Sequence, residues 1–150
     1  MIEGETAPVS IGRGSRLPIA AAFVALVGLV DSVYLTVHHL TAEPVPCSII
    51  SGCETVLTSP YAEIAGIPLA AFGAAAYFVA FSLAVLAASG NRTMWKVFGA
   101  QTVVMALFTG WLIYLQAAVI GAFCQFCLLS AVTSLTLLIL FVVSVLFSRK

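Results

Sequence analysis

The sequence predicts an all-α membrane protein: a bundle of four transmembrane helices with a long extracytoplasmic loop between helices 1 and 2. Hydrophobic residues make up 62% of the 150 residues and charged residues only 8%, whereas about a quarter of the residues of a soluble domain are charged. A helix needs about 20 apolar residues to cross a bilayer, and four stretches satisfy this: residues 19–38, 68–88, 97–120 and 122–147. Lipid offers the backbone no hydrogen-bond partner, so these stretches are expected to be helical.

Basic residues predict the orientation, because Lys and Arg are retained on the cytoplasmic side of a membrane. They occur at three places: before the first helix (Arg13 and Arg16), between the second and third helices (Arg92 and Lys96), and after the fourth helix (Arg149 and Lys150). A chain that crosses the membrane four times has all three of these places on the same side. We expect a multi-pass protein of the cell (inner or plasma) membrane with both termini in the cytoplasm. Residues 1–16 would be a cytoplasmic tail and residues 17–150 the membrane domain. A removable signal peptide is the competing interpretation of the first helix, but no convincing cleavage site follows it.

The predicted loop of residues 41–67 is long for a helix bundle, in which connections commonly take about 2–8 residues. Its first half, from Glu43 to Ser48, is rich in proline and polar side chains and is expected to contain no helix. Its second half, from Cys53 to Tyr61, has the pattern of one or two helical turns that cover the end of the bundle. Pro68 is expected in the first turn of the next helix, where its missing N–H is harmless.

Two cysteine pairs are predicted at this outer face, in an oxidising compartment where disulfides persist. Cys47 and Cys53 are separated by a flexible stretch of serine, isoleucine and glycine, which lets the two sulfurs meet and part. Cys124 and Cys127 stand at i and i+3 near the expected start of the fourth helix, so they share one helix face. A helix N-terminus favours the reactive thiolate. The first pair is expected to be accessible from water and the second from lipid.

Two such pairs predict an electron relay from a soluble thiol protein to a lipid-soluble oxidant, for which a quinone is the obvious candidate. The chain has no haem-attachment motif and no glycine-rich phosphate loop. Disulfides exchange through mixed disulfides. Cys47, in the more exposed part of the loop, is therefore expected to bond first to the partner, and Cys53 to reach Cys124. Cys127, one turn deeper, would then meet the quinone.

Two other interpretations remain open at this point. Four cysteines suffice for a tetrathiolate zinc site, although no metal is expected because one pair lies at the lipid edge. A small multidrug-type or proton-coupled transporter would use Asp31, a carboxylate that is costly inside a membrane helix, with Gln101 and Gln116 along a polar path. Asp31 is otherwise expected to be a packed acid bonded to Ser32, Thr36 or another helix.

The order of the motifs resembles a known family. The chain carries a spaced cysteine pair after the first helix, then Ser59-Pro60-Tyr61, then an Ile-Pro-Leu-Ala-Ala-Phe-Gly helix start, then a Cys-x-x-Cys that opens the fourth helix. This order resembles the bacterial members of the vitamin K epoxide reductase family over residues 28–134. Disulfide-bond oxidases of the DsbB type share the four helices, but their Cys-x-x-Cys belongs to the first external loop.

The resemblance implies roles for the matching residues. Cys124 and Cys127 would be the active-site pair, with Cys127 nearer the quinone, and Cys47 and Cys53 would be the shuttle pair. Ser59 would help to orient the quinone, which would be ubiquinone or menaquinone.

The resemblance also implies partners and a reaction. Leu69 and Ala131 stand where vertebrate members have a quinone-contacting Asn and Tyr, so oxidation of a thiol partner is expected rather than epoxide reduction. Many bacterial relatives carry a fused thioredoxin-like domain, whereas this chain is expected to be a stand-alone member. Its partners would be a separate thioredoxin-like (DsbA-like) thiol protein and the lipid bilayer, with no nucleic acid. The expected activity is that of a quinone-dependent oxidoreductase that generates disulfide bonds.

Overall fold

The computed structural model describes residues 13–149, and it confirms the expected four-helix bundle. Within this range the helices long and apolar enough to cross a membrane are α1 (Arg13–Thr41), α3 (Leu69–Ala88), α4 (Arg92–Tyr114) with its π-helical extension η2 (Leu115–Ile120), and α5 (Gln125–Ser148). The expected tail lies outside the described residues as far as residue 12. Its remainder, from Arg13 to Arg16, already belongs to α1.

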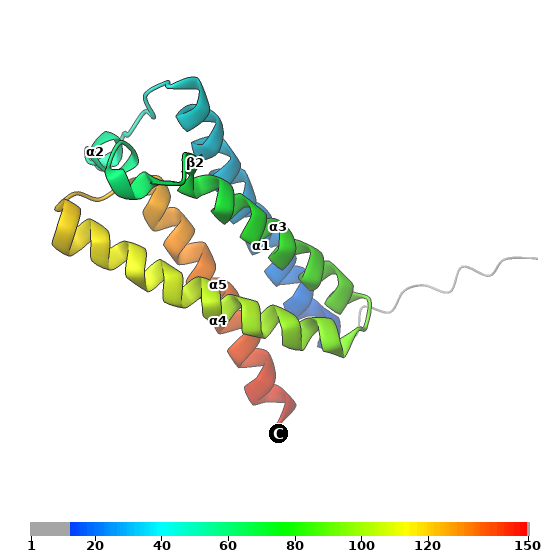
Figure 1. Cartoon of the computed structure of the whole chain (residues 1–150). Coiled ribbons are helices and arrows are strands. Elements are labelled where there is room, and N and C mark those ends of the chain that lie inside the picture. The colour runs from blue at the N-terminus through cyan, green and yellow to red at the C-terminus, as the bar shows by residue number, and fades with distance from the viewer. Residues whose placement is uncertain (1–12, 150) are drawn as a thin grey trace, which may run out of the picture.

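The four long helices form a closed ring (Figure 1). α1 packs against α3 and α5, and α4 packs against the same two helices. A tight turn joins α3 to α4: Gly90 has a φ of 103°, and the Asn91 side chain accepts the N–H groups of Thr93 and Met94 at 3.1 and 3.2 Å. Asn91 therefore caps α4. This turn, the start of α1 and the end of α5 lie at one end of the bundle, and the long loop lies at the other.

Small residues bring the helices close together. The fully buried alanines of the main core are Ala21, Ala25, Ala80 and Ala84. A Cβ on Gly28 would collide with the Tyr77 ring, and one on Gly99 would collide with the Phe141 ring. Small residues at such contacts are typical of membrane helices, whose association depends on close van der Waals packing.

Large apolar side chains point away from the bundle on all four long helices. Examples that are more than half exposed are Phe23, Phe78, Val104, Leu107 and Ile139. In water this surface would cost about 25 cal/mol for each Å², whereas in a bilayer it lies among lipid tails. The exposed apolar belt therefore agrees with the membrane assignment.

The loop between α1 and α3 covers one end of the bundle (Figure 1). Its Pro-rich first half has no helix, as expected. Its second half contains the short helix α2 (Cys53–Leu57) and the 3₁₀ turn η1 (Pro60–Ala62), also in the region where helical turns are expected. We call residues 53–68 the lid.

The last part of the lid is a small β-hairpin that the sequence pattern did not reveal. Strand β1 (Glu63–Ile64) pairs with β2 (Ile67–Pro68), and the turn residues Ala65 and Gly66 have φ angles of 53° and 80°. An alanine in this left-handed region is uncommon, so local propensity gave little signal. Pro68 is the N-cap residue of α3 rather than part of its first turn. A contact of 2.6 Å between His39 Nε2 and Glu63 Oε1 ties the hairpin to α1.

Candidate functional site

Cys47 and Cys53 form a disulfide, whereas Cys124 and Cys127 are free thiols. The intervening residues 48–52 bring the Cα atoms of the bonded pair to 6.2 Å. Cys47 is partly exposed. Cys53 is only 1% exposed, because it begins α2 and packs down onto the bundle. The partly exposed member of the disulfide is thus Cys47, as the sequence predicted.

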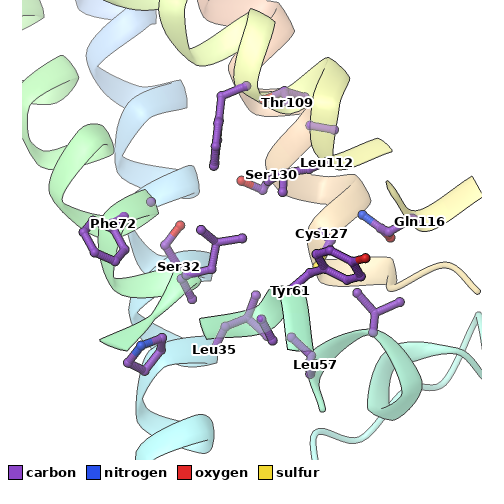
Figure 2. A pocket seen from close by; sticks show the side chains of 18 of the residues that line it. Ser32, Leu35, Leu57, Tyr61, Phe72, Thr109, Leu112, Gln116, Cys127 and Ser130 are labelled. Carbon is purple, nitrogen blue, oxygen red and sulfur yellow. The ribbon is translucent and has the colours of Figure 1, made fainter. Parts of the chain in front are cut away.

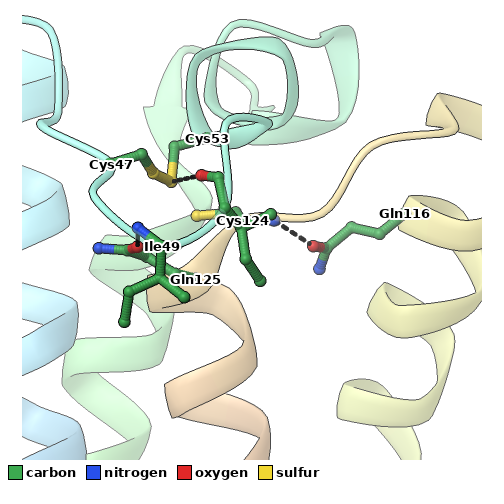
Figure 3. The surroundings of a disulfide bond; sticks show 7 residues. Cys47, Ile49, Cys53, Gln116, Cys124 and Gln125 are labelled. Atoms are coloured by element: carbon green, nitrogen blue, oxygen red, sulfur yellow. Dashed lines mark hydrogen bonds between the residues drawn. A yellow bond between two sulfur atoms is a disulfide. The ribbon is translucent and has the colours of Figure 1, made fainter.

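The two cysteine pairs meet in one apolar cluster. Its buried members are Cys53, Val56 and Cys124, and both Cys47 and Cys127 pack against it. Figure 3 shows Cys124 beside the Cys47–Cys53 disulfide. The expectation that one pair is accessible from water and the other from lipid is therefore wrong for Cys53 and Cys124, which are both buried, with exposed fractions of 1% and 0%. The structure brings together the two cysteines between which exchange was expected.

A break in the helix places Cys124 at the edge of the bundle. η2 ends at Gly121, which has a φ of 70°, and Cys124 is the N-cap residue of α5 with an extended backbone. α5 begins at Gln125, so the expected start of this helix at residue 122 is wrong. The left-handed turn at Gly121 ends the preceding helix and prevents an earlier start.

Two glutamines hold the segments that carry the cysteines (Figure 3). Gln116 Oε1 accepts the backbone N–H of Cys124 at 3.0 Å, and Gln125 Oε1 accepts the backbone N–H of Ile49 at 3.0 Å. Sequence reasoning assigned Gln116 to a transporter path and did not single out Gln125. Nothing in the local pattern distinguishes these glutamines, because their partners come from other parts of the chain.

The Cys124 thiol ionises more readily than an ordinary cysteine. Its pKa is lowered from 9.0 to about 7, and a hydrogen bond from the Cys127 thiol is the largest cause. Burial opposes this shift, as does the Asp31 carboxylate when it is ionised, whereas the backbone N–H groups of Phe126 and Cys127 add to it. Because the thiolate is the nucleophile in disulfide exchange, Cys124 is reactive near neutral pH.

A mostly apolar cavity of about 230 Å³ lies beneath the lid (Figure 2). Its walls come from α1, α3, α4, η2, α5 and the lid, and they include both Ser59 and Cys127. Leu69 and Ala131, which align with the vertebrate contact positions, also line it. An engineered cavity of about 150 Å³ in another protein holds benzene, so this one has room for a single-ring head group.

Ser59 borders the cavity, but its hydroxyl group is already engaged. The hydroxyl donates to the Val56 carbonyl oxygen at 2.7 Å, and the same oxygen accepts the Ser59 backbone N–H at 3.3 Å. If the hydroxyl turned toward a ligand, the Val56 carbonyl oxygen would still accept the backbone N–H of Ser59. Ser59 can therefore exchange its bond without leaving a buried acceptor unpaired.

Asp31 also borders the cavity, and it is only 6% exposed. Among the residues from 13 to 149, neither of its carboxyl oxygens has a hydrogen-bond partner. The expectation of a packed acid bonded to Ser32 or Thr36 is therefore wrong. The Thr36 hydroxyl instead donates to the Ser32 carbonyl oxygen at 2.7 Å.

The zinc and transporter interpretations gain no support from this arrangement. In the described part of the chain, no three His, Cys, Asp or Glu side chains gather as metal ligands, and the disulfide leaves two of the four cysteines as thiols. Gln101 does not line the cavity. Its Nε2 donates to the Ala76 carbonyl oxygen at 2.7 Å, so it joins α4 to α3 rather than forming part of a polar path.

Comparison with known proteins bears on this geometry. Residues 19–142 match the vitamin K epoxide reductase (VKOR) family. The chain belongs to this family. The matched region contains the lid, the cavity walls and both cysteine pairs.

This chain matches about a third of the length of one curated relative. Thiol-disulfide oxidoreductase LTO1 of Arabidopsis thaliana is 31% identical over 121 residues, which cover 75% of this chain and 32% of the relative. The name of that relative describes thiol–disulfide chemistry.

Proposed function

We propose that this VKOR-family chain is a membrane thiol–disulfide oxidoreductase. It passes electrons from a thioredoxin-like (DsbA-like) thiol protein through its two cysteine pairs to a membrane quinone. The supporting observation is the spatial order of the four cysteines from the surface to the cavity. Cys47 is partly exposed and bonded to Cys53, Cys53 is buried with Cys124, and Cys127 borders the apolar cavity. Each cysteine therefore has one role in a path from the surface to the cavity.

The proposed relay consists of disulfide exchanges. A partner thiolate attacks Cys47 and releases Cys53, and the second partner thiol then displaces Cys47, so the partner leaves with a disulfide. Cys53 attacks Cys124 in the oxidised Cys124–Cys127 pair and releases Cys127. Cys47 then attacks Cys53, which restores the loop disulfide and leaves the second pair as thiols. The structure has this last redox state.

The cavity residues suit a quinone head group. Apolar walls match a ring, and the polar groups that border the cavity include the Ser59 hydroxyl, the Cys127 thiol and the Asp31 carboxyl. A bound quinone supplies the oxidising power by accepting two electrons and two protons. Leu69 and Ala131 carry no polar side-chain group, which supports thiol oxidation rather than epoxide reduction as the reaction. Ubiquinone and menaquinone both satisfy this chemistry.

We also propose that the lid faces the periplasm or the cell exterior. Arg16 at the start of α1, Arg92 and Lys96 at the start of α4, and Arg149 after α5 lie at the end of the bundle opposite the lid. Basic residues are retained in the cytoplasm. The disulfide would then lie in the oxidising compartment, where it persists.

Reconstitution with purified components tests the proposed activity. The protein in detergent is mixed with a reduced DsbA-like protein and a short-chain ubiquinone or menaquinone, and partner disulfides and hydroquinone are both measured. We expect equal amounts of the two products, and loss of turnover when any of the four cysteines is replaced by alanine. Ser51→Ala, at an exposed position between the loop cysteines, is the control and should keep full activity. Partner oxidation without hydroquinone, or turnover in a cysteine variant, would contradict the proposal.

A further inference from the structure

Two residues that line the cavity carry buried polar atoms without partners. In the described part of the chain, both carboxyl oxygens of Asp31 and the hydroxyl oxygen of Ser134 are buried and make no hydrogen bond. Asp31 is 6% exposed and Ser134 is 2% exposed, and both line the same cavity. An unsatisfied buried polar group costs about 1–3 kcal/mol, so two such residues in the wall of one cavity point to a polar ligand atom near them.

Helix geometry places these groups deep in the cavity. Asp31, Leu35 and His39 line it from one face of α1, and Cys127, Ser130 and Ser134 line it from one face of α5. With a rise of 1.5 Å per residue, Asp31 lies about 12 Å further from the lid end than His39. By the same rise, Ser134 lies about 10 Å beyond Cys127. The cavity thus has an outer polar end at Ser59 and Cys127 and an inner polar end at Asp31 and Ser134.

Tyr77, a further polar side chain near the inner end, is already bonded. The Tyr77 hydroxyl contacts the Ser130 carbonyl oxygen at 2.7 Å and the Thr133 hydroxyl at 2.7 Å. The titratable side chains that share the cavity with Asp31 are His39 on α1, Tyr61 on η1, Tyr77 on α3 and Cys127 on α5, and the lining residues of α4 include none. Asp31 is therefore the carboxyl group of this cavity.

We propose that Asp31 is a catalytic residue that binds and protonates the quinone oxygen remote from Cys127, with Ser134 as a second hydrogen-bonding group. This inference rests on the proposed function. A quinone has two carbonyl oxygens on opposite sides of its ring, which suits a cavity with polar groups at both ends.

The proton balance closes without another reactant. Oxidation of the Cys124 and Cys127 thiols to a disulfide releases two electrons and two protons, which equals what quinone reduction takes up. The protonated Asp31 carboxyl donates its proton to the remote oxygen, and a proton released by the thiol pair restores it. Asp31 thus returns to its starting state after each turnover.

Two substitutions separate binding from proton donation. Asp31→Asn keeps a hydrogen-bond donor but carries no transferable proton, so the KM for quinone should stay close to that of the wild type. Its kcat should fall at least about tenfold, because a general acid typically contributes 10²-fold or more. Asp31→Leu removes both functions, so its KM should rise and its kcat should fall. Thr36→Val, five residues along α1 and outside the cavity lining, is the matched control and should change neither.

A spectroscopic measurement and a stability measurement complete the test. Infrared difference spectra with a ¹³C-carbonyl-labelled ubiquinone should show a hydrogen-bonded carbonyl band in the wild type and in Asp31→Asn, and its loss in Asp31→Leu. Without quinone, Asp31→Leu should be at least as resistant to thermal unfolding as the wild type, because it removes an unpaired buried carboxyl group.

Three results would overturn the inference, and they point to different faults. A wild-type protein that exchanges disulfides but reduces no quinone would overturn the proposed function together with this inference. If the wild type reduces quinone and Asp31→Leu matches it in rate and carbonyl band, the inference alone fails. If Asp31→Leu is markedly less stable than the wild type and keeps the wild-type carbonyl band, Asp31 is a structural residue.

Discussion

Gly52 lies so close to Phe123 that no side chain fits between them. A Cβ on Gly52 would stand 2.5 Å from the Phe123 carbonyl oxygen and 2.9 Å from its backbone nitrogen. These are backbone atoms, so they cannot move aside as the end of a flexible side chain can. Gly52 immediately precedes Cys53 and Phe123 immediately precedes Cys124. This contact therefore controls how closely the two cysteine pairs approach.

Gly52→Ala is expected to slow disulfide exchange between the pairs while the loop disulfide still forms. A displacement of about 1 Å can reduce a rate on the order of a hundredfold, so a loss of tenfold or more is expected. The rate is measured by reducing the loop pair and following its reoxidation by mass spectrometry. Gly110→Ala is the control, since a Cβ there meets no other atom within 4 Å. Equal rates for Gly52→Ala and the wild type would show that the contact does not set the approach.

Cys127→Ala is expected to accumulate a disulfide between Cys53 and Cys124. Without Cys127, the Cys124 thiolate attacks Cys53 and releases Cys47. The resulting Cys53–Cys124 disulfide can then be resolved only by Cys47. Cys53 is expected as the target because it shares the buried cluster with Cys124. Peptide mapping by mass spectrometry identifies the bonded pair. A Cys47–Cys124 bond in its place would exchange the roles of the two loop cysteines.

The reactivity of Cys124 should rise as the pH increases through about 7, because its pKa is lowered from 9.0 to about 7. Below this pH the thiol is protonated and slow, and above it the thiolate predominates. Iodoacetamide labelling of Cys124 with the loop disulfide intact, followed by mass spectrometry across a pH series, measures the midpoint. Cys127→Ala removes the largest stabilising contact, so the midpoint should move up toward 9.0. If the midpoint of the labelling curve does not change in Cys127→Ala, the lowered pKa of Cys124 is due to the backbone N–H groups at the start of α5 instead.

A membrane-impermeant thiol reagent applied to intact, reduced cells should label Cys47, since the lid is proposed to lie outside the cytoplasm and Cys47 is partly exposed. The control is Ser89→Cys in a chain without other cysteines, because Ser89 is exposed in the turn between α3 and α4 at the opposite end. It should react only after lysis. The reverse pattern would invert the proposed orientation.

Ser59→Ala should raise the KM for quinone about twofold to tenfold, which corresponds to one hydrogen bond worth about 0.5–1.5 kcal/mol. Turnover with a water-soluble thiol oxidant in place of quinone should remain unchanged, because the cysteines are untouched. Steady-state kinetics with each oxidant separates the two effects. An unchanged KM would leave Ser59 as a residue that only bonds to Val56 within the lid.

Properties that depend on nearby residues could be predicted from the sequence. Mean hydropathy and the distribution of charged residues predicted the four membrane helices, because a bilayer span requires one continuous apolar stretch of sequence. The Pro-rich start of the loop and the helical turns after Cys53 also followed from local preferences. The spacing of Cys124 and Cys127 predicted a pair at the start of the fourth helix, and the structure places Cys127 in the first turn of α5 and Cys124 at its N-cap, where the backbone is extended rather than helical. The helix boundaries were less accurate, since the left-handed turn at Gly121 delays α5 to Gln125.

Contacts between distant residues appeared only in the tertiary structure. Gln125 meets Ile49 across 76 positions of sequence, and Cys53 shares a buried cluster with Cys124. The contact of Gly52 with Phe123 and the unpaired carboxyl group of Asp31 are equally invisible in a local pattern. Such relationships depend on how the helices and the loop pack together, because packing determines which polar groups find partners and which remain unpaired.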